Sequence, residues 1–266
     1  SGGGPTYLIA ASNTPTLLKN RADYICDGTS DEIEINAALV LGNTQLMDGT
    51  YVISSWILIP SDRTLFGTGQ NSIITSSGAL TGARGVGGTF TSGNTMISNS
   101  GSQNITVKDL TVNGDQAVDV GFGIAFLSVG SGLTSNSIGG VTVENVTIKN
   151  TYISGIELRN CWNNLINNNS IFNTHYDPIT ISRIAAGNLR STNTIISNNI
   201  IAYGYTTIFV QYSDKTIIKG NTSNNTLDQG IQCENCNDLL IEGNSLLNGS
   251  DFLITNMSCN DVIINN

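Results

Sequence analysis

Three consecutive residues near the middle of the chain, His175, Tyr176 and Asp177, combine side chains that suit proton transfer. An imidazole or a phenol can take up or release a proton, and a carboxylate can orient the imidazole or bind a cation. His175 is the only histidine, and Arg159 and Arg183 flank it although the chain has only 11 Lys and Arg. We expect these five residues to form a catalytic cluster, in which Arg159 or Arg183 neutralises a substrate carboxylate.

A second set of residues has the side chains that bind saccharides. Aromatic rings stack on sugar faces, while amides and carboxylates hydrogen-bond to hydroxyl groups. The set comprises Glu157, Tyr203, Tyr205, Phe209, Gln211, Gln232 and Glu234. If the sugars are uronates, a base can remove the proton at carbon 5 while a cation stabilises the enolate. A lyase would then expel the neighbouring glycosidic oxygen, and an epimerase would return a proton to the opposite face.

Two alternative functions remain open. A glycoside hydrolase needs two carboxyl groups about 5–9.5 Å apart, and the candidate pairs are Glu157 with Asp177 and Asp228 with Glu234. A non-catalytic tailspike, adhesin or surface protein needs no such pair. An outward Phe209 is compatible with that reading, because it could serve carbohydrate binding or the packing of a homotrimer.

The same residues also have purely structural interpretations. His175 and Asp177 can form a plain hydrogen-bonded pair. Arg159 with Glu157, or Arg183 with Asp177, can form surface ion pairs worth less than about 1 kcal/mol.

The residues of this cluster belong to a repeat that fills the second half of the chain. It is marked by asparagines 24, 30, 22 and 23 residues apart, which are Asn145, Asn169, Asn199, Asn221 and Asn244. A period of this length with short apolar runs is typical of a solenoid. Within each repeat apolar and polar residues alternate, as in Ile156-Glu157-Leu158, which is the period of a strand.

These patterns predict an all-β fold, a right-handed single-stranded parallel β-helix with three short strands per turn. Its handedness follows the general rule for parallel crossovers. Successive turns would stack about 4.8 Å apart, so that one position of the repeat forms a column along the axis. An asparagine column at a bend is favourable, because Asn tolerates left-handed backbone angles and its amide can bond to the next Asn.

The periodicity predicts one domain, the β-helix, over residues 23–266, preceded by an irregular segment over residues 1–22. An N-terminal cap is expected at about residues 27–42. Three stretches rich in small polar residues are expected to be long excursions that wall a binding cleft, at residues 76–103, 128–140 and 184–193.

The cap contains a predicted helix over about residues 31–41. Ser30 has the chemistry of an N-cap, and Ile33, Ala37 and Leu41 recur at helical spacing. Such a helix would cover the apolar end of the first coil, which otherwise exposes core side chains and strand edges.

The opening of this region resembles the pectate-lyase-like β-helix superfamily. The matching segments are DGTSDEIEINAAL at 27–39, DGTYVIS at 48–54 and RTLFGTG at 63–69. Phage tailspikes, uronate epimerases and many polysaccharide-active proteins open similarly. The resemblance implies a polysaccharide partner and a location outside the cell or on a virion or cell surface.

A shorter segment, Tyr176-Asp177-Pro178, resembles the Tyr-x-x-Asp-Pro-His segment of alginate epimerases and related lyases. Ile179 stands where that family has its histidine, and His175 precedes the motif instead.

The amino-acid composition restricts the classes of molecule that can be partners of this chain. The net charge of −9 and the pI of about 4.4 argue against nucleic acid. No apolar run approaches the length of about 18 residues that a membrane span needs. Calcium is the one cofactor that the many Asp and Asn residues leave open. The next asparagine of the column would fall at position 267, so we expect a truncated C-terminus or a partner chain that covers the last turn.

Aligning the repeats places three of the five cysteines, Cys161, Cys236 and Cys259, in one column with Ser213. We expect a column of small inward side chains. The spacing would also permit a disulfide between Cys236 and Cys259. No metal site is expected at the Cys-Glu-Asn-Cys segment, since no further pair completes it.

Overall fold

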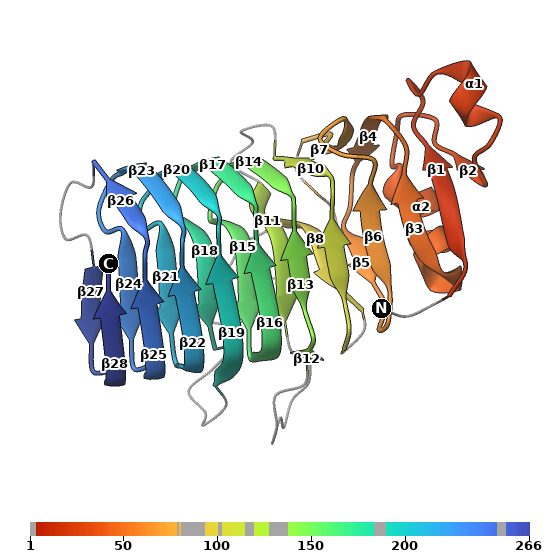
Figure 1. Ribbon diagram of the computed structural model, residues 1–266. Coiled ribbons are helices and arrows are strands. Elements are labelled where there is room, and N and C mark those ends of the chain that lie inside the picture. The colour runs from red at the N-terminus through yellow and green to blue at the C-terminus, as the bar shows by residue number, and fades with distance from the viewer. Residues whose placement is uncertain are drawn as a thin grey trace.

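The computed structural model describes residues 4–78, 80, 94–100, 103–114, 120–127, 138–183, 190–248 and 254–266. Their strands form three parallel sheets that wind around one apolar core, and between β3 and β27 each coil contributes to all three sheets (Figure 1). The predicted all-β solenoid is therefore confirmed.

We refer to the three sheets as A, B and C. Sheet A consists of β2 (Tyr24–Ile25), β1 (Thr6–Ala10), β3 (Asn43–Leu46), β6 (Thr64–Gly67), β9 (Thr106–Lys108), β13 (Thr142–Glu144), β16 (Cys161–Asn167), β19 (Ser191–Ser197), β22 (Ser213–Lys219), β25 (Asn237–Glu242) and β28 (Asn260–Asn265), with β12 (Ile138–Gly139) beside β16. Sheet B consists of β4 (Gly49–Ile53), β7 (Ser72–Ser76), β10 (Thr111–Asn113), β14 (Thr147–Thr151), β17 (Ser170–Thr174), β20 (Ile200–Gly204), β23 (Thr222–Thr226) and β26 (Ser245–Leu247). Sheet C consists of β5 (Ile57–Ile59), β8 (Asn94–Asn99), β11 (Val120–Leu127), β15 (Ser154–Arg159), β18 (Asp177–Ser182), β21 (Ile208–Gln211), β24 (Ile231–Glu234) and β27 (Ile254–Met257).

Inward positions form aliphatic columns. Ile166, Ile196, Ile218 and Ile241 are register partners on successive strands of sheet A, and all four are fully buried. Side chains that stack in this way remove apolar surface from water on each coil, which is the main stabilising term of the fold.

An asparagine ladder, buried at Asn169, Asn199 and Asn221, runs beside this core at the bend between sheets A and B. Each side-chain Nδ2 donates to the Oδ1 of the next residue at 2.9–3.1 Å, in the order Asn169, Asn199, Asn221, Asn244 and Asn266. The ladder was predicted to continue at position 267, and that prediction is wrong by one residue.

Asn145 is not part of the buried ladder, contrary to the sequence-based alignment. Glu144 pairs in register with Asn167, which places Val146 at the ladder position and Asn145 in the exposed column beside it. There Asn168 Nδ2 donates to Asn145 Oδ1 at 2.6 Å. Both residues have φ near +55°, as expected for Asn at a tight bend.

The predicted capping helix is present as α2 (Glu32–Leu41), but a different face is buried. Ile35, Ala38 and Leu39 join the core, whereas Ile33 and Leu41 are exposed. The residue at the N-cap position is Asp31, not Ser30. The helix packs against β3, β4 and β5 at the N-terminal end of the solenoid, as the capping role requires (Figure 1).

Residues 1–22 were expected to be irregular, yet residues 6–10 form β1 and pair with β3. The segment also contains α1 (Thr16–Lys19). The strand β1 extends sheet A beyond β3, and its residues Ile9 and Ala10 are buried in the core region.

The three expected excursions fall largely outside the described residues. Within the first of them, residues 94–99 form β8 of sheet C instead of irregular chain. Within the second, residues 138–139 form β12 beside β16. Within the third, β19 begins at residue 191.

The cysteine column is confirmed, with Ser191 as a further member. Cys236 N donates to Cys259 Sγ at 3.2 Å, but both thiols are free. Burial raises the pKa of the Cys236 thiol to about 12, so it stays protonated at neutral pH.

Among the described residues, no helix is long and apolar enough to cross a membrane.

Candidate functional site

The outer face of sheet C carries the predicted column. Glu157, Thr180, Phe209 and Gln232 are register partners on β15, β18, β21 and β24. Ser154 Oγ lies 3.2 Å from Thr180 Oγ1, so the start of β15 shares this outer face.

Gly155 explains why β15 can turn its first residue outward. A Cβ at this position would lie 2.7 Å from Ile171 Cγ2 and 2.8 Å from the Pro178 carbonyl oxygen. Only a glycine lets the backbone pass so close to the core at the bend from sheet B to sheet C.

Glu157 and Arg159 form an ion pair through Oε1 and Nε on β15. The pair is almost fully buried, with residue exposures of 1% and 9%. Ser182 Oγ also donates to Glu157 Oε1, at 3.5 Å, and Glu157 Oε2 has no hydrogen-bond partner among the described residues. Burial raises the pKa of the Glu157 carboxyl, and the Arg159 guanidinium opposes that rise. The ion pair predicted as one interpretation is thus present, but it is buried.

Asp177 begins β18, the strand that pairs with β15, and is half-buried. Burial raises the pKa of its carboxyl to about 7, against a hydrogen bond that Thr206 N donates to Oδ1 at 3.2 Å. The charges of Glu157 and Asp228 raise the pKa further. A carboxyl that titrates near neutral pH can serve as either an acid or a base.

An aromatic cluster lies immediately before Asp177, where β17 passes into β18. The His175 ring stacks on Tyr152 at 4.8 Å between centroids, with an interplanar angle of 7°. Tyr176 packs edge-on against both rings, and its centroid lies 6.5 Å from that of Tyr205. The rings of Tyr176 and Tyr205 are exposed, so this cluster offers flat apolar surfaces to solvent.

Sequence reasoning missed Tyr152. The sequence did contain a signal, because Thr151-Tyr152 and Thr174-His175 are one repeat apart. The structure shows that Thr151 and Thr174 are register partners.

Two predicted residues lie apart from this cluster. Arg183 follows β18, and its guanidinium carbon lies 3.3 Å from the ring centroid of Tyr212. Tyr203, a predicted saccharide-binding residue, belongs to β20 of sheet B, where it is exposed with φ of 60°. Among the described residues it makes no ring contact with Tyr176 or Tyr205.

Farther along sheet C, three predicted binding residues form a closed network. Gln211 Nε2 donates to Glu234 Oε2 at 2.7 Å, and Gln232 Nε2 donates to Glu234 Oε1 at 2.6 Å. Phe209 is half-buried beside them.

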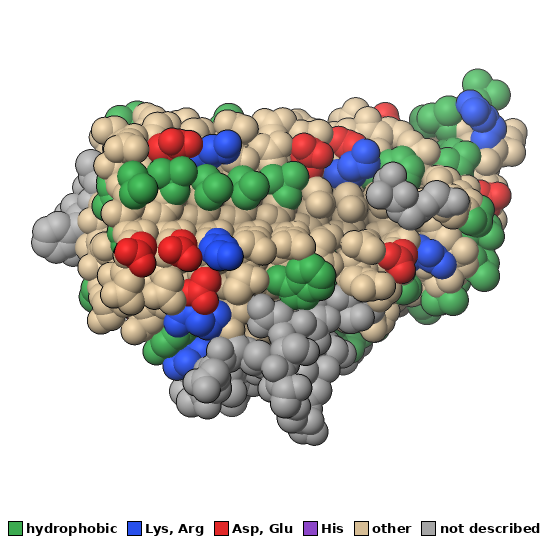
Figure 2. All heavy atoms as spheres, turned by 60° about the horizontal axis from the view of Figure 1, so that its bottom comes forward, with side chains coloured by type: hydrophobic (Ala, Val, Ile, Leu, Met, Phe, Trp, Pro, Cys, Tyr) green, Lys and Arg blue, Asp and Glu red, His purple; other side chains and the backbone are tan. Residues whose placement is uncertain are grey.

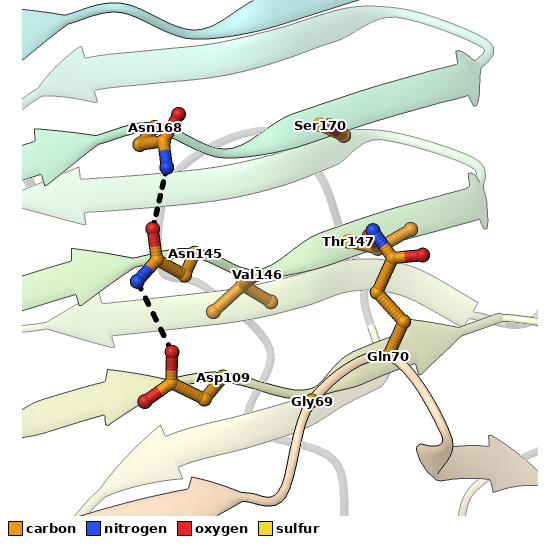
Figure 3. Close-up of a pocket in the computed structure, with 8 residues that line it drawn as sticks. All are labelled: Gly69, Gln70, Asp109, Asn145, Val146, Thr147, Asn168 and Ser170. Carbon is orange, nitrogen blue, oxygen red and sulfur yellow. Dashed lines mark hydrogen bonds between the residues drawn. The ribbon is translucent and has the colours of Figure 1, made fainter.

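The structure also shows depressions away from sheet C. One of about 390 Å³ lies at the bend between sheets A and B (Figure 3). Asn168, Asn145 and Asp109 line one side of it in a hydrogen-bonded column, and Gln70 lies across from them. A second, of about 400 Å³, lies farther along the same bend at Asn198, Lys219 and neighbouring residues. Neither depression contains a predicted site residue.

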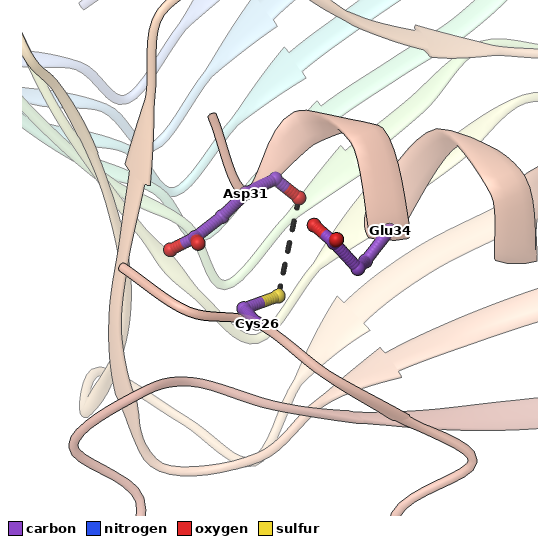
Figure 4. A group of neighbouring side chains, drawn as sticks. All are labelled: Cys26, Asp31 and Glu34. Carbon is purple, nitrogen blue, oxygen red and sulfur yellow. Dashed lines mark hydrogen bonds between the residues drawn. The ribbon is translucent and has the colours of Figure 1, made fainter. Parts of the chain in front are cut away.

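Cys26, Asp31 and Glu34 come together near the start of α2 (Figure 4). Both carboxylate oxygens of Asp31 already accept backbone hydrogen bonds, from Gly28 N at 2.9 Å and Val52 N at 2.7 Å. Burial raises the pKa of the Cys26 thiol, which keeps its proton and faces the Asp31 carbonyl oxygen. These contacts stabilise the turn before α2, and the backbone N–H groups already occupy both carboxylate oxygens of Asp31.

A family model described as right-handed beta helix region matches residues 131–266, just over half of the chain. The chain belongs to the right-handed β-helix family. This match confirms the predicted handedness of the coil. A search of curated protein sequences finds no match.

Solved structures with the same fold include both enzymes and phage proteins. The A-module of the mannuronan C-5 epimerase AlgE6 from Azotobacter vinelandii has 13% identity and a TM-score of 0.56, over 88% of this chain and 74% of that one. An exopolygalacturonase from Thermotoga maritima has 13% identity and a TM-score of 0.57, over 86% and 70%. The enzymatically active domain of bacteriophage CBA120 tailspike protein 2 has 11% identity and a TM-score of 0.58, over 88% and 40%. The resemblance to β-helix epimerases and tailspikes is thereby confirmed at the level of fold.

Proposed function

We propose that the outer face of sheet C binds and modifies a uronate-containing polysaccharide by lyase or epimerase chemistry. One observation carries the proposal. Asp177, a carboxyl whose pKa burial raises to about 7, directly follows the aromatic residues His175 and Tyr176 and is close enough to Glu157 for that charge to raise its pKa further.

The aromatic cluster supports substrate binding. Tyr176 and Tyr205 expose ring faces next to Asp177, and such rings stack on the apolar faces of sugars. The stacked His175 and Tyr152 rings hold Tyr176 in place from the side.

Asp177 is the proposed base. Its carboxylate takes the proton from carbon 5, and the electron pair moves into the uronate carboxyl group as an enolate. The proposed stabiliser of that negative charge is the Arg159 guanidinium, which is paired with Glu157 and 9% exposed in the absence of substrate. A proton from Tyr176 or His175 then goes either to the departing glycosidic oxygen, as in a lyase, or to the opposite face of carbon 5, as in an epimerase.

Hydrolysis by Glu157 and Asp177 is less well supported. Glu157 is 1% exposed and its Oε1 is held by Arg159. A carboxylate in that position lacks the access to sugar or water that the two-carboxylate mechanism needs.

The names of similar structures support the substrate class. They include a mannuronan epimerase and an exopolygalacturonase, both of which refer to acidic polysaccharides. The bacteriophage tailspike among them supports the proposed location outside the cell or on a virion or cell surface.

The test is to incubate the chain with alginate, polygalacturonate and neutral glucans. Ultraviolet absorbance detects unsaturated uronates, and proton NMR detects inversion at carbon 5. We expect one acidic polymer to react, and Asp177→Asn to lower kcat at least about 100-fold, as for loss of a general base. Asp261→Asn is the matched control, because Asp261 is exposed on the last strand of sheet A. No reaction with any polymer, or full activity in Asp177→Asn, would overturn the proposal.

A further inference from the structure

One outward column of sheet A changes from threonine to aliphatic residues along the solenoid. Its members are register partners on consecutive strands, namely Thr106, Thr142, Leu165, Ile195, Ile217, Leu240 and Ile263. The first two are threonines and the remaining five are aliphatic. We refer to these five as the aliphatic ladder.

The aliphatic ladder faces solvent. The neighbouring positions, such as Ile196 and Ile218, fill the core, whereas Ile195 and Ile217 point outward and are only partly buried. Ile263 is 57% exposed. Threonine suits an outward strand position as well as isoleucine does, so strand formation alone does not require the change. Figure 2 shows the ladder as a row of hydrophobic side chains along the molecule.

Charges of both signs flank the ladder on both sides (Figure 2). Toward sheet B, Lys219 and Glu242 are register partners on β22 and β25. At the other edge, Lys215 and Asp238 occupy the equivalent bend positions of the same two coils, and both are exposed. Each flank therefore carries a lysine on one coil and an acid on the next.

We propose that the aliphatic ladder is the interface with a second copy of this chain, packed face to face and antiparallel. The two-fold axis lies along the strand direction, between the coils of Ile217 and Leu240. This operation reverses the order of coils but keeps each column opposite itself.

The proposed symmetry matches both the apolar and the charged columns. Ile217 of each copy faces Leu240 of the other. Lys219 faces the second copy's Glu242, and Lys215 faces the second copy's Asp238. Sheets packed face to face lie about 10 Å apart, a separation that these side chains can bridge.

A parallel arrangement of the two copies is unfavourable, because it places like charges opposite each other. A two-fold axis along the solenoid keeps the order of coils and exchanges the flanks. Lys219 would then face Lys215, and Glu242 would face Asp238, so every flanking pair would repel.

The size of the interface predicts weak association. The axis pairs the coil of Ile217 with that of Leu240 and the coil of Ile195 with that of Ile263, and it leaves the coil of Leu165 at the edge of the interface. Four coils at about 4.8 Å and six residues at about 3.3 Å define a patch of roughly 400 Å² per copy. Stable dimers bury about 800 Å² per partner. We expect a dissociation constant in the micromolar range.

Sedimentation velocity over a concentration series tests the proposal with charge reversal. Lys219→Glu and Glu242→Lys should each weaken the dimer at least tenfold, because each places two like-charged pairs in the interface. The two variants should form a heterodimer when mixed, since every pair is then complementary. The double variant should recover wild-type association for the same reason.

Lys149→Glu is the control, with the same change of charge on the outer face of sheet B, and it should leave association unchanged. A wild-type chain that stays monomeric or forms trimers would overturn the proposal. Tighter association of Lys219→Glu alone would also overturn it, because that result marks the parallel arrangement. Failure of the mixed variants to associate would have the same consequence.

Discussion

Asn199 lies in the middle of the buried asparagine ladder, and its replacement measures what the ladder contributes to stability. Its Oδ1 accepts hydrogen bonds from N and Nδ2 of Asn169, both at 3.0 Å. Its Nδ2 donates to Asn221 Oδ1 at 2.9 Å and to the Ile166 carbonyl oxygen at 3.1 Å. The side chain is fully buried, so Asn199→Ala removes four hydrogen bonds that water cannot easily replace.

The expected loss of unfolding free energy depends on which polar groups keep a hydrogen-bond partner in the Asn199→Ala variant. Asn169 Nδ2 keeps its bond to the Val143 carbonyl oxygen, and Asn221 Oδ1 keeps the bond from Asn199 N. The backbone N–H of Asn169 loses the acceptor that the structure gives it. Four net hydrogen bonds at about 1 kcal/mol each, with an added penalty for a buried donor, predict a loss of about 4–6 kcal/mol.

Asn198→Gly is the matched control. Asn198 is adjacent, exposed and has φ of 55°, and the next two coils have Gly220 and Gly243 at this position. The loss of unfolding free energy in Asn198→Gly should stay within about 0.5 kcal/mol. Urea unfolding followed by circular dichroism gives both values. A loss below about 1 kcal/mol for Asn199→Ala, or equal losses for the two variants, would refute the idea that amide stacking stabilises the coils.

Three further predictions concern single side chains. Burial raises the pKa of Asp177 from 3.8 to about 7; the folded chain therefore holds this proton more tightly, and wild-type stability falls as pH rises between these values. Asp177→Asn should thus gain in melting temperature relative to wild type from about pH 4 to pH 8. In the native chain Cys259 alone should react rapidly with a thiol reagent, because the other four thiols are buried; a second fast thiol would contradict this. Tyr205→Ala should weaken polysaccharide binding at least fivefold by calorimetry, and Tyr203→Ala, outside the cluster, should not.

The fold could be predicted from the sequence because alternation and the asparagine period are local signals. Register was harder, since Asn167, Asn168 and Asn169 are consecutive and any of them could align with Asn145. Only the strand pairing shows that Asn145 matches Asn168.

The face of α2 could not be read from the sequence for a similar reason. Glu32 is buried, and its carboxylate accepts hydrogen bonds from Ser54 N at 3.0 Å and Ser54 Oγ at 2.9 Å. This buried acid shifts the inward face away from Ile33, and its partner lies a full coil later in the chain.

The candidate site was predicted in outline but not in its electrostatics. The column of Glu157 and Thr180 follows from counting along the repeats. The pKa of Asp177 instead depends first on its burial, and then on Thr206 and Asp228, which lie one and two coils farther along and are brought close only by folding.

The two proposals place different functions on different faces of one solenoid. The aliphatic ladder lies on sheet A and Asp177 on sheet C, so a dimer formed through sheet A leaves both copies of the Asp177 face uncovered. Because the copies are antiparallel, the two faces run in opposite directions. A long polymer that reaches both faces would bind with the effective concentration of a tethered ligand, whereas a short oligosaccharide would occupy each face independently. Weak association is then sufficient, since a shared polymer would itself hold the two copies together.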